Sequence, residues 1–291
     1  MMKEIIVIVG PTGVGKTKLS VELAKMINAE IINADSMQIY KGLDIGTAKI
    51  TEDEKEGIVH HLFDIKDVSE QYTIYDYQKD CRMIIDDILS RGKKVIMVGG
   101  SGLYIRAALY DYNLQEEQSF NSYDDLSNEE LLKKVLEIDP DSKIHINNRK
   151  RLVRFLNKID NNDEIQKESL PIYDFCMIGL TTERDKLYNI INNRVDKMIS
   201  CGLIDEVKSY YDKGIYSKAI MTGIGYKELY QYFSNDILLN EAIELIKRNS
   251  RRYAKRQYTF FNNQFAVKWF NTNYDNFLDT VNSVYCYLKE D

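Results

Sequence analysis

The feature that most constrains the fold of this chain is a glycine-rich loop between a predicted strand and a predicted helix. The strand is a continuous, largely β-branched run over residues 4–9, and apolar residues follow at helical spacing over 16–28. The loop consists of Gly10, Pro11, Thr12, Gly13, Val14, Gly15, Lys16 and Thr17, which fits the pattern G-x-x-x-x-G-K-(S/T). In this context backbone N–H groups converge on phosphate oxygens at the positive end of the helix. The sequence therefore predicts a diphosphate-binding loop, with Lys16 as a point charge and the Thr17 hydroxyl as a ligand of Mg²⁺.

Strands and helices alternate along much of the chain. Apolar runs predict further strands at 30–34, 94–98 and 175–180. Segments of helical character lie at 71–91, 183–201, 204–213, 225–233 and 240–261. This order predicts an α/β fold of the P-loop NTPase-like class, in which helices flank a mostly parallel sheet.

The alternation breaks after Leu109, where residues 111–128 are polar and weakly periodic. A capping box at 127–130 starts a helix that ends before Asp139-Pro140. We therefore expect a core built from residues 1–110 and 146–291. It carries a small helical insertion domain at residues 111–145.

Asp35 follows the second predicted strand, at the sheet edge where doubly wound folds bind their ligands. There it can face the phosphate loop. In a kinase or nucleotide hydrolase such an aspartate holds Mg²⁺ through water, whereas beside an acceptor substrate it acts as a general base. The residues alone leave both roles open, and a purely structural aspartate is a third possibility.

Composition excludes several classes of protein. Hydrophobic content of 44% and charged content of 29% are ordinary for a globular chain. The four cysteines are far apart and the three histidines do not complete a zinc pattern. No run approaches the roughly 18 apolar residues of a membrane span, and the first apolar run leads into the glycine loop without a cleavage site. We expect a cytoplasmic protein that does not contact membranes.

The net charge of −6 conceals two basic segments. Residues 142–159 contain six lysines and arginines and no acidic residue, and residues 245–274 interleave basic and aromatic side chains, again without an acidic residue. Either segment alone is more often a solvated helix face than a nucleic-acid contact.

A set of longer motifs resembles the tRNA dimethylallyltransferase family. These motifs are DSMQIYKGLDIGTAK at 35–49, HHLFD at 60–64, GGSGLY at 99–104, KRLVR at 150–154, GIGYKE at 223–228 and RRYAKRQ at 251–257. Because they occur in order over nearly the whole chain, the resemblance is specific.

The resemblance implies transfer of a dimethylallyl group from dimethylallyl diphosphate to N6 of the adenosine immediately 3′ of the anticodon. It implies Asp35 as the base, and Lys16, Ser101 and Arg194 at the diphosphate or the reacting centre. It also implies tRNA contacts for Asp35, Ser36, Met37 and Gln38, for Lys150, Arg151, Leu152, Val153 and Arg154, and for Arg248, Arg251, Arg252 and Lys255. Mg²⁺ is the expected cofactor, the tRNA anticodon stem-loop is the expected partner, and we expect a monomer.

Three alternatives stay open. A small-molecule or nucleoside kinase would use the same loop and Asp35 but would consume ATP. A prenyltransferase acting on free AMP would not need the two basic segments. A tRNA-binding module without catalysis would be expected to have lost part of the phosphate loop or Asp35, and both are intact in this sequence.

Overall fold

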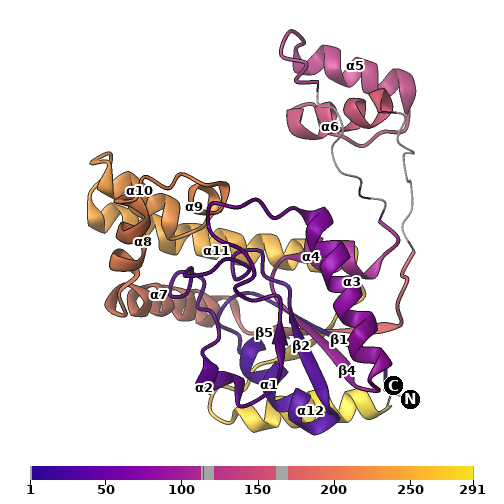
Figure 1. Ribbon diagram of the computed structural model, residues 1–291, viewed down its shortest axis with the longest axis vertical. Coiled ribbons are helices and arrows are strands. Elements are labelled where there is room, and N and C mark those ends of the chain that lie inside the picture. The colour runs from indigo at the N-terminus through magenta and orange to yellow at the C-terminus, as the bar shows by residue number, and fades with distance from the viewer. Residues whose placement is uncertain (1, 113, 115–120, 162–169, 291) are drawn as a thin grey trace. The chain divides into compact units, whose positions relative to one another are not determined.

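The computed structural model describes residues 2–112, 114, 121–161 and 170–290 (Figure 1). These residues form a six-stranded sheet in the order β3-β2-β4-β1-β5-β6, with every neighbouring pair parallel. The strands are β1 Ile5–Val9, β2 Ala29–Asn33, β3 His60–His61, β4 Lys94–Val98, β5 Phe175–Thr181 and β6 Lys268–Asn271. The predicted parallel sheet is confirmed, and the short edge strands β3 and β6 are additions to it.

Helices cover both faces of this sheet. They are α1 Lys16–Ile27, α2 Glu52–Lys55, α3 Ile74–Ser90, α4 Gly102–Leu109, α7 Arg184–Ser200, α8 Leu203–Tyr211, α9 Lys218–Thr222, α10 Tyr226–Phe233, α11 Leu239–Gln264 and α12 Phe277–Glu290. The helices predicted from periodicity lie within a few residues of α1, α3, α7, α8, α10 and α11. Helices α2, α4, α9 and α12 were not predicted from the sequence.

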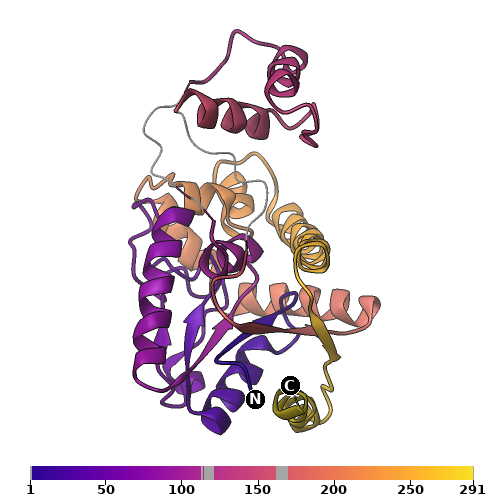
Figure 2. The same ribbon diagram turned by 90° about the vertical axis from the view of Figure 1, so that its right-hand side faces the viewer.

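Alternate residues of β1 pack against different helix layers, as expected for a strand buried on both faces. Ile5, Val7 and Val9 join the cluster that contains the inner faces of α3 and α4. Ile6 and Ile8 join the cluster that contains α1 and α12. Accordingly, α3 and α12 lie on opposite sides of the sheet (Figure 2).

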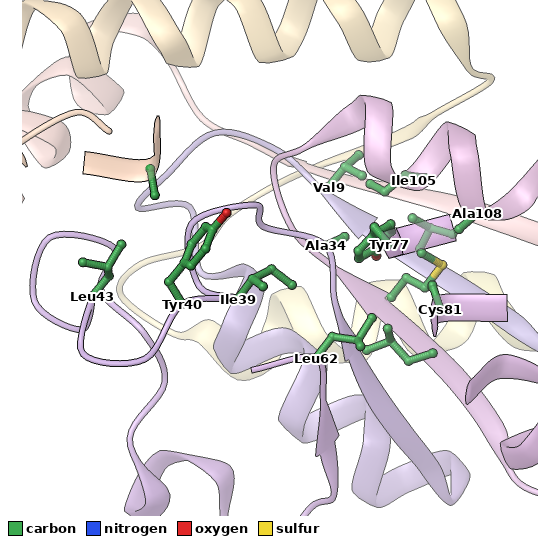
Figure 3. Packing of buried hydrophobic residues seen from close by; sticks show 14 of the residues in the cluster. Val9, Ala34, Ile39, Tyr40, Leu43, Leu62, Tyr77, Cys81, Ile105 and Ala108 are labelled. Carbon is green, nitrogen blue, oxygen red and sulfur yellow. The ribbon is translucent and has the colours of Figure 1, made fainter. Parts of the chain in front are cut away.

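The first of these clusters extends to the carboxyl ends of the central strands. Figure 3 shows Val9 and Ala34, at the ends of β1 and β2, beside Tyr77 of α3 and Ile105 of α4. All four side chains are fully buried. The strand ends that carry the glycine loop and Asp35 therefore stand on a packed apolar base.

A second compact unit comprises Asp111–Leu170. Within it, α5 (Asn128–Ile138) begins at the predicted capping box and packs on α6 (Arg149–Asp160). The predicted limit of 145 for the insertion is wrong, because the apolar face of α6 completes a small core with α5. The insertion therefore extends to residue 170, and α6 belongs to it rather than to the P-loop core.

No helix in the described part of the chain is long and apolar enough to cross a membrane.

Candidate active site

Three neighbouring strands bring the predicted catalytic residues to one edge of the sheet. β2, β4 and β1 are adjacent and parallel, so their carboxyl ends lie side by side. The glycine loop follows β1, Asp35 follows β2 and Ser101 follows β4. Residues far apart in the sequence thus converge where open α/β sheets bind ligands.

The glycine loop has the conformation and the close contacts that its sequence predicts. Gly13 and Gly15 have φ angles of 86° and 91°, a region that favours glycine. A Cβ atom on Gly13 would lie 2.6 Å from Ile190, and one on Gly15 would lie 2.5 Å from the Phe277 ring. The first turn of α1 has no acidic side chain, so its positive end is open to an anion.

Lys16 and Arg194 place two half-buried cations beside this loop. The Lys16 ammonium donates to the Pro11 carbonyl oxygen at 2.7 Å, and neither cation forms an ion pair with a described residue. Burial and the nearby Arg194 guanidinium lower the pKa of Lys16 to about 7, although Asp35 opposes the shift. Burial also lowers the pKa of Arg194, again against the effect of Asp35. Two cations without an ion-pair partner in one half-buried site favour a multivalent anion.

Asp35 is held by its own strand end. Its N–H donates to Asn33 Oδ1 at 2.9 Å, and the Asn33 amide donates back to the Asp35 carbonyl at 3.0 Å. Oδ1 of Asp35 accepts from the Met37 N–H at 2.9 Å. The second carboxylate oxygen has no hydrogen-bond partner among the described residues, so it is available to a proton on a bound substrate.

Ser101 lies against the segment that follows Asp35. Its hydroxyl oxygen accepts from the Ser36 N–H at 3.1 Å and lies 3.3 Å from the Ser36 hydroxyl. The Ser101 N–H donates to the Ala34 carbonyl at 3.0 Å. The ends of β2 and β4 are therefore joined directly beside Asp35.

The loop after Asp35 positions two further predicted residues. The Thr47 carbonyl accepts from the Arg194 guanidinium at 3.5 Å and from the Gln38 amide at 3.1 Å. The Glu206 carboxylate of α8 holds this loop through the N–H groups of residues 44–46, at 2.7–3.1 Å, and also accepts from the Tyr226 hydroxyl at 2.6 Å. Glu206 was not predicted, because the segment around it shows only an ordinary amphipathic helix.

The basic face predicted on α11 is present, with one correction. Arg248, Arg252 and Lys255 are exposed. Arg251 is only half-buried, and its guanidinium donates to Asn192 of α7 at 2.5 Å. Arg251 therefore packs α11 on α7 as well as carrying charge, so it is less available for the tRNA contact that the resemblance implied than its three neighbours are.

Two residues of the KRLVR motif are also corrected. In α6 of the second unit, Lys150, Arg151 and Arg154 are exposed. Leu152 and Val153 are buried against α5, where they are 0% and 6% exposed. Their side chains form the core of the insertion, so the predicted contact with tRNA is not available to the side chains of these two.

Tyr253 and Gln257 of α11 also reach the site, although no catalytic or binding role was predicted for either. Burial and Asp35 raise the pKa of Tyr253 to about 12, against a hydrogen bond with Ser101. Gln257 donates to the Gly100 carbonyl at 3.1 Å. Both residues lie in RRYAKRQ, a motif dominated by basic residues, and they are on the side of α11 that faces the core.

Comparison with known proteins agrees with this geometry. A family model described as IPP transferase matches residues 38–264. The tRNA dimethylallyltransferase of Anoxybacillus flavithermus is 47% identical, over 99% of this chain and 97% of that protein. The tRNA dimethylallyltransferase of Bacillus subtilis is 46% identical, over 92% of this chain and 90% of that protein.

Solved structures agree over nearly the full length of the chain. The tRNA isopentenylpyrophosphate transferase of Bacillus halodurans has a TM-score of 0.77 and 43% identity, and the match covers 99% of this chain and 97% of that one. A eukaryotic dimethylallyltransferase described as acting on tRNA has a TM-score of 0.82 and 29% identity, with 98% and 77% covered. The core is thus a P-loop NTPase-like α/β fold, and the chain belongs to the IPP transferase family.

Proposed function

We propose that this protein transfers a dimethylallyl group from dimethylallyl diphosphate to N6 of the adenosine 3′ of the anticodon in tRNA. The observation that carries the proposal is the unpaired cation pair Lys16–Arg194, which lies beside the glycine loop and next to Asp35. Membership of the IPP transferase family supports assigning this anion site to a prenyl diphosphate. An NTPase would use the same loop for nucleotide, so the acceptor must be tested directly.

The reaction follows from the groups at the edge of the sheet. The N6 lone pair attacks the first carbon of the dimethylallyl group, and the bond between that carbon and the diphosphate oxygen breaks with its electron pair on oxygen. Loop amides, Lys16 and Arg194 stabilise the charge that develops on diphosphate. Asp35 takes the N6 proton through its second carboxylate oxygen. Ser101 hydrogen-bonds the acceptor beside it.

The residues present also fit Mg²⁺. Thr17 is exposed at the start of α1, and its hydroxyl has no protein partner among the described residues. No three acidic, histidine or cysteine side chains gather there or elsewhere in the described ranges, as suits an ion that takes most of its ligands from phosphate and water. Thr17 would hold the ion, which when bound would neutralise part of the diphosphate charge.

Diphosphate binding should be linked to proton uptake by Lys16. With a pKa of about 7, the Lys16 side chain is mostly the neutral amine at pH 8 when no ligand is bound. A bound anion favours its protonated form. We expect uptake of about one proton per site at pH 8, little uptake at pH 6, and affinity that falls as pH rises above 7. Calorimetry in buffers of different ionisation enthalpy measures the uptake. Lys16→Met should abolish it, and equal uptake in that variant would contradict the assignment.

The exposed residues of α11 suit an RNA backbone. Arg248, Arg252 and Lys255 recur at helical spacing on its exposed side. Extracting the target base from its stack costs a few kcal/mol, which contacts to neighbouring phosphates can offset. One protein can present this surface to one anticodon stem-loop, so we propose that the enzyme acts as a monomer in the cytoplasm.

Neutralising this surface should change the salt dependence of RNA binding. Arg252→Ala and Lys255→Ala should each weaken binding of an anticodon stem-loop severalfold. Each should also flatten the slope of log K against log salt concentration by about 0.7. Fluorescence anisotropy over a salt series measures both quantities. Lys289→Ala, at an exposed position of α12, is the matched control and should change neither; an equal effect there would show that only net charge matters.

The function is tested by incubation with unmodified anticodon stem-loop RNA, dimethylallyl diphosphate and Mg²⁺, followed by nucleoside mass analysis. Parallel tubes replace the RNA with AMP, or the prenyl donor with ATP. N6-dimethylallyladenosine from the RNA tube alone is the expected result. Prenylated AMP would show that free AMP is an acceptor in place of tRNA, and ATP turnover without prenyl product would favour a kinase.

A further inference from the structure

The peptide bond between Gly100 and Ser101 is held from two sides. Its N–H, which belongs to Ser101, donates to the Ala34 carbonyl at the end of β2 at 3.0 Å. Its carbonyl oxygen accepts from Gln257 Nε2 of α11 at 3.1 Å, and the Tyr253 hydroxyl lies 3.5 Å from the same oxygen. Because a peptide group is planar, these contacts together set the direction in which the Ser101 side chain points from the backbone.

Gln257 is built closely into this contact. The residue is 5% exposed, and a Cβ atom on Gly100 would lie 2.0 Å from its Nε2. Its Oε1 is buried without a hydrogen-bond partner in the described part of the chain. Burying a side-chain amide with one unsatisfied oxygen is costly, so a role in packing alone does not explain why glutamine occupies this position.

The effect of the contact passes directly to the catalytic segment. Ser101 accepts from the Ser36 N–H at 3.1 Å, and Ser36 is the residue after Asp35. The hydroxyls of Tyr253 and Ser101 also interact. A shift of the Gly100 carbonyl would therefore move the Ser101 hydroxyl and the backbone beside Asp35 together.

We propose that Gln257, assisted by Tyr253, is a positioning residue for the transfer step and acts through Ser101. The inference rests on the proposed function, in which Ser101 contacts the acceptor. The same helix carries the exposed cations Arg252 and Lys255. One face of α11 thus meets the RNA, and the opposite face fixes the hydroxyl that meets the base.

A matched pair of variants separates positioning from stability. Gln257→Met removes the donor with little change in volume. Gln78→Met does the same on α3, where a buried glutamine donates to the Ala107 carbonyl of α4 at 2.8 Å. We expect both variants to lose thermal stability. Only Gln257→Met should slow single-turnover transfer to stem-loop RNA, by about tenfold, as expected for one lost hydrogen bond, with the Kd for dimethylallyl diphosphate unchanged.

Non-additivity provides the second readout. If Gln257 acts through Ser101, Gln257→Met should slow transfer less than twofold in a Ser101→Ala background. Tyr253→Phe should show the same dependence and covers the case in which Gln257→Met does not fold. Its control is Tyr258→Phe on the same helix, which removes a hydroxyl that lies 2.7 Å from Oγ1 of Thr181 in β5.

The outcomes are distinct. Three outcomes would overturn the positioning role. The first is the full tenfold slowing by Gln257→Met in the Ser101→Ala background. The others are an equal slowing by Gln78→Met or Tyr258→Phe, and wild-type rates for both Gln257→Met and Tyr253→Phe. Wild-type enzyme that makes no prenylated RNA in the same assay would instead reject the proposed function.

Discussion

Asp35→Asn should reduce prenyl transfer about a thousandfold while diphosphate binding persists, because general-base catalysis contributes on the order of 10²–10⁴ in rate. Asparagine keeps the size of the side chain and can accept from the Met37 N–H, which lies 2.9 Å from Asp35 Oδ1. It cannot take a proton from the N6 amine. Single-turnover rates with stem-loop RNA measure the loss, and calorimetry with inorganic diphosphate measures the retained binding.

The control for this variant is Asp205→Asn. Asp205 is exposed on α8, and its carboxylate forms no hydrogen bond or ion pair with a described residue. We expect wild-type rates from it. Asp35→Asn that transfers prenyl groups at the wild-type rate would show that another group accepts the proton, and loss of diphosphate binding would show that Asp35 mainly organises the anion site.

Lys16→Met should lower kcat/KM for dimethylallyl diphosphate by roughly 10²–10³, the size found when one preorganised donor to a developing charge is removed. Most of the loss should be in kcat, since the charge on the bridging oxygen grows as the carbon–oxygen bond breaks. The variant also relieves the repulsion between Lys16 and Arg194. We therefore expect its thermal stability to be equal to or above that of the wild type.

Lys18→Met is the matched control for Lys16→Met. Lys18 is exposed on the same helix, with its ammonium 5.0 Å from the centre of the Phe277 ring. Steady-state kinetics with varied prenyl donor should give wild-type kcat and KM for Lys18→Met. If Lys16→Met altered KM alone, Lys16 would contribute to ground-state binding and not to the transition state.

Local signals predicted the centre of this fold well. The runs that form β1, β2, β4 and β5 are apolar and bounded by turn residues, so their identity as buried parallel strands follows from pattern alone. The glycine loop and Asp35 then fall at the correct edge by topology. β3 and β6 were missed because strands as short as His60–His61 and Lys268–Asn271 carry too few residues for a periodic signal.

Tertiary contacts decided what the sequence could not. The limit of the insertion depends on the packing of α6 on α5, which basic composition obscures. The motif KRLVR does not by itself show that its lysine and arginines face solvent while Leu152 and Val153 face the core, because this follows only once the helix is predicted. The roles of Glu206 and Gln257 arise from single side chains meeting distant backbone, and no local pattern records such contacts.

The glycine loop is closed by residues that are synthesised long after it. Thr272 donates to the Val14 carbonyl at 2.8 Å, and the Phe277 ring lies under Gly15. On a ribosome the loop is thus among the first segments to emerge. The residues that contact it are made only after about 260 further residues, which takes roughly 15–50 s of synthesis. A nascent chain should therefore be unable to capture prenyl diphosphate until α12 is being made, so incomplete chains would not sequester the cell's donor pool.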